Sequence, residues 1–238
     1  MTTELLYLKD SYLREFEAVV VEVADNYVVL DRTAFHPTSG GVDKDLGSLV
    51  RGDSVYEVVD VVIESGDVVK HVVRSTSGLF PGAVVRGVID WGRRYRLMRL
   101  HTASHILSAV MYRDFSALIT GGHVYPEYAR DDFDFEKFDR EVFEEAFRKV
   151  NEVVGWGLEV KIYWLPRDEA LKIPGITKLA QRSLPQVPYL RIVEIPGVDV
   201  QADGGPHVRS TSEIGFVKLL KVENRGKKRK RVYYTVEP

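Results

Sequence analysis

The sequence "DWGRRYRLMRLHTASHILSAVMY", from Asp90 to Tyr112, marks a change of secondary structure along the chain. Within it, apolar side chains recur every three or four residues, and two histidines keep the same period on the adjoining stripe. This periodicity is typical of an α-helix. The two stripes are Leu97, Leu100, Ser104, Leu107 and Met111, and Met98, His101, His105 and Ser108. We predict a helix that begins near Arg93 and a domain boundary around Gly92, with domains at residues 1–92 and 93–238.

The residues before this helix form short runs that are rich in Val, Ile and Tyr. Turn-forming sequences, "ADN", "SGG", "RGD" and "ESGD", separate these runs. Closely spaced strands without an intervening helix are typical of a small barrel or sandwich. We therefore predict an N-terminal β-barrel domain that carries a glycine-rich motif.

The residues after this helix alternate between helical and strand patterns. We predict a second helix over residues 136–154 and strands over "YARDDFDF" and "LEVKIYWL". A further helix starts with Pro166 in its first turn, and the final segment has the pattern of two strands joined by a turn at residues 224–226. The second domain is therefore predicted to be α+β, with helices packed on a largely antiparallel sheet.

The composition indicates a globular protein with a substantial core. The 238 residues are 45% hydrophobic and 29% charged, and no run approaches the roughly 18 apolar residues that a membrane span requires. The start of the chain, "MTTELLYLKD", lacks the order of a signal peptide, so we expect a cytoplasmic protein. Because the chain has no cysteine, any metal must be held by His, Asp or Glu.

Charge is distributed unevenly along the chain. The formal net charge of −2 argues against a protein that coats nucleic acid without selectivity. Between Lys218 and Arg231, however, eight basic residues accompany one acid, Glu223. This run indicates a local phosphate-binding surface, and a solvated charged face is the alternative interpretation.

The motif "HTASH" places His101 and His105 four residues apart within the predicted helix. Their imidazoles then project from one face and can meet a single cation. A merely polar helix face is an equally good interpretation of the pair alone. Metalloprotease helices carry a Glu directly after the first His, and Thr102 at that position disfavours such an enzyme.

A second motif, "DGGPH", supplies Asp203 and His207 on what we predict to be a tight loop. Two glycines let the backbone turn sharply, so both side chains could face one point. Alone, the motif is better explained as a turn that leads into a strand. Together with the two helical histidines it offers three imidazoles and one carboxylate, which is enough for a tetrahedral cation site or for three ligands and a water.

Four ordered motifs resemble those of the alanyl-tRNA editing proteins, the free-standing relatives of the editing domain of alanyl-tRNA synthetase. They are "LDRTAFHPTSGGVDKDLGSLV", "RLHTASHILSAV", "VDVQADGGPHVRSTSEIG" and "KVENRGKKRKRVYYTV", of which the last resembles the closing hairpin of the archaeal members, here of medium length. The chain departs from the family pattern at Asp203, Pro206 and Val42, where Cys, Thr and Gln are usual. Aspartate can ligate zinc through oxygen, although a harder ligand shifts metal preference.

The resemblance implies hydrolysis of a wrong amino acid, chiefly serine and also glycine, from the 3′ end of tRNA(Ala). It implies one Zn²⁺ held by His101, His105, Asp203 and His207, with the three histidines as catalytic residues. The metal would position the substrate, activate a water, or do both. Oligomeric state stays open, and no membrane partner is expected.

Other residues are expected to bind the substrate. A pocket that admits serine cannot reject the smaller alanine by size, so polar groups that are left unpaired without the serine hydroxyl must reject it. A buried hydroxyl such as Thr120 is the candidate for this contact, and a structural threonine at the start of a strand is an equally good interpretation. Backbone near Gly40, Gly41, Gly204 and Gly205 is expected to contact the substrate as well. The residues expected to contact tRNA phosphates are Arg93, Arg94, Arg99, Lys221, Arg225, Lys227, Lys228 and Arg229.

Two other functions fit the same motifs. The first is an RNA-binding paralogue that has lost its metal and its catalysis, as the changes at Asp203 and Pro206 could indicate. The second is a metallohydrolase that acts on small esters. Metal analysis distinguishes the editing enzyme from the first alternative, and activity on small serine esters would indicate the second.

Overall fold

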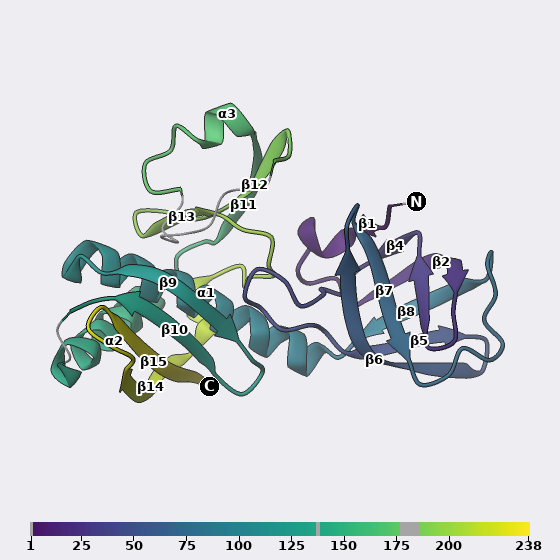
Figure 1. Cartoon of the computed structure of the whole chain (residues 1–238), viewed down its shortest axis with the longest axis horizontal. Coiled ribbons are helices and arrows are strands. Elements are labelled where there is room, and N and C mark those ends of the chain that lie inside the picture. Colours follow the sequence, from purple (N-terminus) through teal and green to yellow (C-terminus); the bar gives the residue numbers. More distant parts are fainter. Residues whose placement is uncertain (1, 137–138, 177–185) are drawn as a thin grey trace. The chain divides into compact units, whose positions relative to one another are not determined.

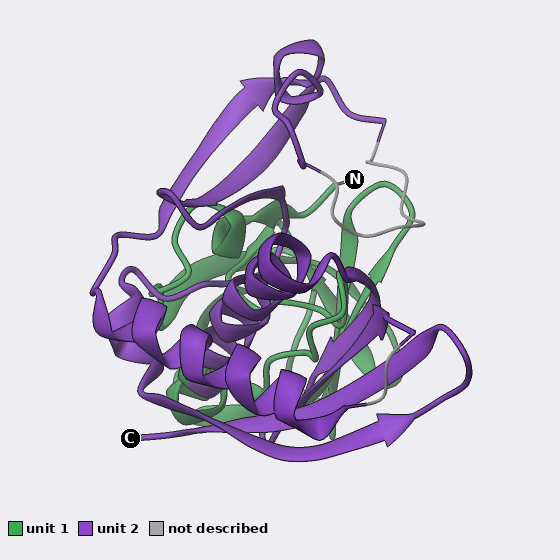
Figure 2. Cartoon of the chain, turned by 90° about the vertical axis from the view of Figure 1, so that its left-hand side faces the viewer, with its two compact units in different colours: residues 1–95 green, residues 96–238 purple. Residues whose placement is uncertain are grey.

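The computed structural model describes residues 2–136, 139–176 and 186–238. The chain divides into two compact units, residues 1–95 and residues 96–238 (Figures 1 and 2). The division falls within helix α1 (Trp91–Phe115), which begins two residues before the predicted Arg93. The predicted domain limits, 1–92 and 93–238, stay a prediction. Within the described residues, no helix combines the length and the apolar character needed to cross a membrane.

The first unit is built around a closed barrel of six antiparallel strands, as the spacing of turns predicted. Along β2, exposed and buried residues alternate, so that Phe16, Ala18 and Val20 enter the barrel core. A short 3₁₀ helix (Leu6–Leu8) and the parallel pair β1 (Glu4–Leu5) and β4 (Arg32–Thr33) accompany the barrel. In barrel order the strands are β2 (Glu15–Val23), β3 (Tyr27–Leu30), β7 (Val68–Val73), β6 (Ser54–Glu64), β5 (Gly47–Arg51) and β8 (Val84–Ile89).

Arg94, in the first turn of α1, is fully buried inside the first unit. Its guanidinium is ion-paired with the buried Asp45 and donates to the carbonyl oxygens of Ser11 and Ala34. A guanidinium enclosed in this way cannot reach a phosphate. The prediction that Arg94 binds RNA is therefore wrong: its charge neutralises a buried carboxylate instead.

The second unit contains a four-stranded antiparallel sheet in the order β14 (Phe216–Asn224), β15 (Arg229–Glu237), β10 (Ala129–Asp134) and β9 (Leu118–Val124). Helix α2 (Arg140–Gly155) is capped at its N-terminus by Asp139, whose side chain accepts the Glu141 N–H. Asn151 of α2 exchanges two hydrogen bonds with the backbone of Val217. The helix is thereby fastened to the outer strand β14, and the predicted closing hairpin is the pair β14 and β15.

A second, three-stranded sheet contains β11 (Lys161–Pro166), β12 (Tyr189–Ile195) and β13 (Asp199–Ala202), all antiparallel. It appears at the top of Figure 1 with the short helix α3 (Arg167–Ala170). One of its faces has a small core of its own, formed by Ala170, Ile176, Leu190 and Ile192. The chain is thus mostly sheet with few helices, and its second unit has two sheets where the sequence indicated one.

Candidate metal centre

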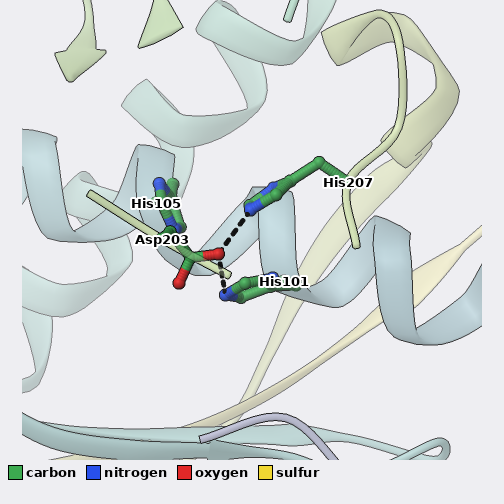
Figure 3. A group of neighbouring side chains, drawn as sticks. All are labelled: His101, His105, Asp203 and His207. Atoms are coloured by element: carbon green, nitrogen blue, oxygen red, sulfur yellow. Dashed lines mark hydrogen bonds and ion pairs between the residues drawn. The ribbon is translucent and has the colours of Figure 1, made fainter. Parts of the chain in front are cut away.

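Four side chains from two distant segments converge in the second unit (Figure 3). His101 and His105 lie one turn apart on α1, and Asp203 and His207 lie on the loop that follows β13. One nitrogen or oxygen atom from each residue can be chosen so that all four lie within 4.8 Å of one another. The three histidines are buried and Asp203 is partly exposed. The structure therefore brings together all four residues of the predicted ligand set.

The loop from residue 203 to 207 is held in place by a hydrogen bond to its own Asp203 side chain and by Arg191. The Asp203 Oδ1 atom accepts the Gly205 N–H at 2.8 Å, which closes a tight turn. Arg191 on β12 donates to the carbonyl oxygens of Asp203 and Gly205 at 2.8 and 3.0 Å. A Cβ atom at Gly205 would lie 2.5 Å from Cε1 of His101, so only glycine allows this approach.

Each imidazole is oriented by an oxygen atom that faces its Nδ1. His101 Nδ1 faces the carbonyl oxygen of Pro206 at 3.2 Å, and His105 Nδ1 faces Oδ2 of Asp199 at 3.0 Å. Both oxygens can only accept, so both Nδ1 atoms carry hydrogen. The lone pair of each of these two rings is then on Nε2, which is the form that binds a metal.

His207 has the same arrangement, through a hydroxyl group. Its Nδ1 lies 3.0 Å from Oγ1 of Thr102, and that hydroxyl donates to the carbonyl oxygen of Met98 at 2.9 Å. Because the hydroxyl proton is committed to Met98, Oγ1 accepts from Nδ1–H of His207. The tautomer assigned from this network places the His207 lone pair on Nε2 as well.

With these tautomers, electron pairs face one another at the centre of the cluster. Oδ1 of Asp203 lies 3.1 Å from Nε2 of His207 and 3.7 Å from Nε2 of His101. Two acceptors at such a distance repel unless a proton or a cation lies between them. Three imidazole nitrogens and one carboxylate oxygen form a four-ligand set of the kind that zinc accepts, with oxygen as its one harder donor.

Burial determines the protonation of the imidazoles. It lowers the pKa of His101 to about 4 and that of His207 well below its usual range, so both are neutral at pH 7. Burial by itself would raise the pKa of Asp203, but any proton that the cluster takes up goes to a neighbouring imidazole, and the attraction of that ring, chiefly His101, holds the pKa of Asp203 well below the usual range. The cluster therefore presents neutral nitrogen ligands and an ionised carboxylate, the protonation states that metal binding requires.

Several predicted substrate residues lie outside this cluster. The Thr120 hydroxyl, on β9, is half-buried and donates to the carbonyl oxygen of Asp132 at 3.3 Å. Gly204 and Gly205 belong to the loop of the centre. Gly40 and Gly41 adopt positive φ angles of 62° and 90° in the first unit, and their contact with substrate stays a prediction.

The predicted RNA-binding arginines of α1 make structural contacts. Arg93 is ion-paired with Asp43, and Arg99 donates to the carbonyl oxygens of Ile214 and Glu237. The basic residues of the closing hairpin are different, because Lys221, Arg225, Lys227, Lys228 and Arg229 are all exposed. The hairpin is therefore the accessible part of the predicted RNA surface.

Sequence reasoning did not identify Asp199, Thr102 or Arg191, which orient the ligands or hold their loop. One signal for Asp199 was present, because "DVQAD" alternates and places Asp199, Gln201 and Asp203 on one face of a strand. No local pattern marked Thr102 and Arg191. Their roles depend on the loop that packs against them.

Comparison with known proteins gives matches to two family models. Residues 190–233 match the threonyl and alanyl tRNA synthetase second additional domain, and residues 3–93 match the tRNA synthetases class II (A). The first match includes Asp203 and His207, and the second includes the whole barrel.

Relatives that match this chain over nearly their full length include two archaeal proteins. The alanyl-tRNA editing protein AlaX-M of Saccharolobus solfataricus is 56% identical over 238 residues, which cover 99% of this chain and 100% of that relative. The AlaX-M protein of Methanosarcina acetivorans is 43% identical over 242 residues, which cover 98% of this chain and 99% of that relative. The alanine–tRNA ligase of Ignicoccus hospitalis is 39% identical over 92% of this chain, which spans 24% of that ligase.

Proposed function

Because the chain belongs to the alanyl-tRNA editing proteins of the AlaX-M type, we propose that it removes serine from Ser-tRNA(Ala) in trans, with Gly-tRNA(Ala) as a second candidate substrate. The protein is an aminoacyl-tRNA deacylase that acts in translation fidelity. We place this activity in the cytoplasm. The observation that carries the proposal is the convergence of His101, His105, Asp203 and His207 in a chain similar to these relatives over its full length.

The reaction is the hydrolysis of an ester and requires no ATP. Water adds to the ester carbonyl, the bond to the ribose oxygen breaks, and the proton goes to that oxygen, which gives free serine and tRNA with an intact 3′ end. A zinc ion held by the four residues would supply Lewis acidity toward the carbonyl or lower the pKa of a water to about 7. The chain's own part is to hold three Nε2 lone pairs and one carboxylate oxygen in one place.

Selectivity for serine over alanine requires a polar partner for the serine hydroxyl. We propose Thr120 for this role, because its hydroxyl proton is directed to Asp132 and its oxygen retains lone pairs that can accept from a substrate hydroxyl. A partner of this kind cannot recognise glycine, which has no side-chain hydroxyl. If glycine is a substrate, it must enter by its small size.

We propose that the exposed basic residues of the closing hairpin contact the phosphates of the tRNA. They lie on one β-turn and the strand ends beside it, where long side chains can follow a backbone of phosphates. Arg93 and Arg99 stay secondary predictions because both side chains bind protein groups.

The test is deacylation of Ser-, Gly- and Ala-tRNA(Ala), combined with metal analysis of the purified protein. We expect hydrolysis of Ser-tRNA(Ala), no hydrolysis of Ala-tRNA(Ala), and about one zinc per chain. His101→Ala should abolish both activity and zinc binding, whereas His123→Ala, which removes a histidine outside the cluster, should keep both. A metal-free protein that binds tRNA without hydrolysis would support the inactive paralogue, and hydrolysis of small serine esters would support the general esterase.

A further inference from the structure

Two large aromatic side chains are exposed on the three-stranded sheet of the second unit. Trp164 on β11 is 43% exposed and Tyr189 on β12 is 60% exposed. The small core of this sheet contains Leu190 and Ile192, with Tyr163 and Leu165 packed against it. Because side chains alternate between faces along a strand, Trp164 and Tyr189 belong to the other face. Their aromatic surface is therefore not explained by that core.

The strand register places Trp164 in line with the candidate metal centre. Trp164 is the direct partner of Arg191 in the pairing of β11 with β12. On the other side of β12, Ile192 pairs with Ala202, and the Asp203 N–H donates to the Arg191 carbonyl oxygen at 3.1 Å. Directly opposed residues share a face, so Trp164, Arg191 and Asp203 form a row across the sheet. With strands about 4.8 Å apart, the backbone of Trp164 lies roughly 10 Å from that of Asp203.

Tyr189 extends this aromatic surface. It precedes Arg191 by two residues and therefore points to the same face, and it pairs with Pro166. Trp164 and Tyr189 are diagonal neighbours, at a spacing of about 7–8 Å that aromatic side chains can bridge. The Arg191 guanidinium, which donates to Asp203 and Gly205, lies between them and the loop of the centre.

We propose that Trp164 and Tyr189 form a stacking surface for the unpaired bases at the 3′ end of the tRNA substrate. This inference rests on the proposed function, in which the ester to be hydrolysed is attached to the terminal ribose. With that ester at the cluster, the terminal base is one sugar ring away, and the exposed rings stand in the row of residues that leads to Asp203. Unpaired RNA bases stack on aromatic and arginine side chains irrespective of their sequence, and a protein partner has no comparable link to the centre.

The first experiment uses Trp164 as a fluorescent reporter of binding. The chain has three tryptophans, so Trp91→Phe combined with Trp156→Phe leaves Trp164 alone. This protein is titrated with an uncharged acceptor-stem hairpin that has an intact 3′ end, and with the same hairpin carrying abasic sites at its last two positions. We expect the intact RNA to quench Trp164 and to bind at least about fivefold more tightly than the abasic RNA. Equal affinity and equal emission with both RNAs would overturn the inference.

The second experiment compares matched variants in deacylation. Trp164→Leu and Tyr189→Leu should each raise KM for Ser-tRNA(Ala) by about tenfold with little change in kcat. The control is Trp156→Leu, since Trp156 is 59% exposed at the end of α2 and outside the proposed surface.

Unchanged KM in both aromatic variants, with normal hydrolysis, refutes the stacking surface and leaves the proposed function intact. If Trp164 fluorescence is quenched only by RNA with intact bases, but Ser-tRNA(Ala) is not hydrolysed, the stacking surface is supported and the proposed function is refuted.

Discussion

Asp199 is not one of the four candidate metal ligands, but it orients one of them. Its Oδ2 atom accepts from Nδ1 of His105 at 3.0 Å and from the Gln201 amide at 2.9 Å. The carboxylate thus holds the His105 ring in one tautomer and is itself held by its neighbour on the strand. Carboxylates that orient a ligating histidine commonly contribute to metal affinity.

We expect Asp199→Ala to weaken zinc affinity by about 10- to 100-fold, because the His105 ring loses the acceptor that fixes its orientation. Competition with a chromophoric chelator measures this affinity. In the metal-free protein, ¹⁵N chemical shifts of His105 should move from one tautomer toward a mixture. Gln201→Ala, which removes only the support of Asp199, should have a smaller effect. An unchanged dissociation constant and an unchanged tautomer in Asp199→Ala would show that Asp199 does not orient His105.

At the scale of elements, a buried carboxylate connects α1 to the four-stranded sheet. Asp131 of β10 accepts hydrogen bonds at one oxygen, Oδ2, from Ser104 of α1 and from Tyr234 of β15. Burial raises the pKa of Asp131 to about 6, although both hydrogen bonds oppose the shift. The junction of three elements therefore contains a carboxyl group whose ionisation is unfavourable in the folded protein.

The sign of the resulting pH dependence follows from the raised pKa. Below about pH 4, Asp131 is protonated in both states and its full contribution to stability is present; this contribution is lost as the pH rises through about 6. A pKa raised from 3.8 to about 6 corresponds to roughly 3 kcal/mol of stability. Asp131→Asn, which stays neutral, should therefore gain stability relative to wild type above pH 6 and show little gain at pH 4. Denaturant unfolding at both pH values measures the difference.

Asp132 provides a matched control on the same strand. It is ion-paired with Arg231, and although burial alone would raise its pKa, the arginine lowers it. Asp132→Asn should therefore destabilise the protein at pH 7, with a difference that diminishes in acid. If Asp131→Asn and Asp132→Asn show the same pH profile, the assignment of a raised pKa to Asp131 is incorrect.

Across the whole molecule, RNA binding depends on where the basic side chains lie more than on the net charge. The net charge is only −2, yet Lys227, Lys228 and Arg229 are exposed together at the end of the closing hairpin. Contacts between such side chains and RNA phosphates release counterions, so the binding constant falls as salt increases. This dependence can report how many phosphates the hairpin neutralises.

We expect the triple change Lys227→Gln, Lys228→Gln and Arg229→Gln to weaken tRNA binding and to reduce the slope of log Kd against log salt by about 2. Filter binding at several salt concentrations measures the slope. The control is Arg140→Gln with Arg148→Gln, because both arginines are ion-paired with glutamates on α2. If only the control pair changes the slope, the RNA lies on another surface.

Much of the fold followed from short-range pattern. The helix of "HTASH", the strands of the barrel and the closing hairpin were all predicted, because helical and strand periods and turn residues act within a few positions. The separate three-stranded sheet was not predicted. The choice between one sheet and two depends on strand pairing over long separations, as between Pro166 and Tyr189.

For the candidate centre, the amino-acid sequence alone was enough to name four residues that converge, since "HTASH" and "DGGPH" each hold two of them at a spacing set by local backbone geometry. Only the tertiary structure decided which residues orient these four side chains and which predicted residues are too buried to contact a substrate. Thr102 meets His207 across 105 positions, and Arg94 is enclosed with Asp45 across 49. The exposure of Trp164 also depends on tertiary structure, because the strand register places it on the face of the three-stranded sheet opposite the small core. Burial and hydrogen-bond partners are properties of segments distant in sequence, and no local pattern specifies them.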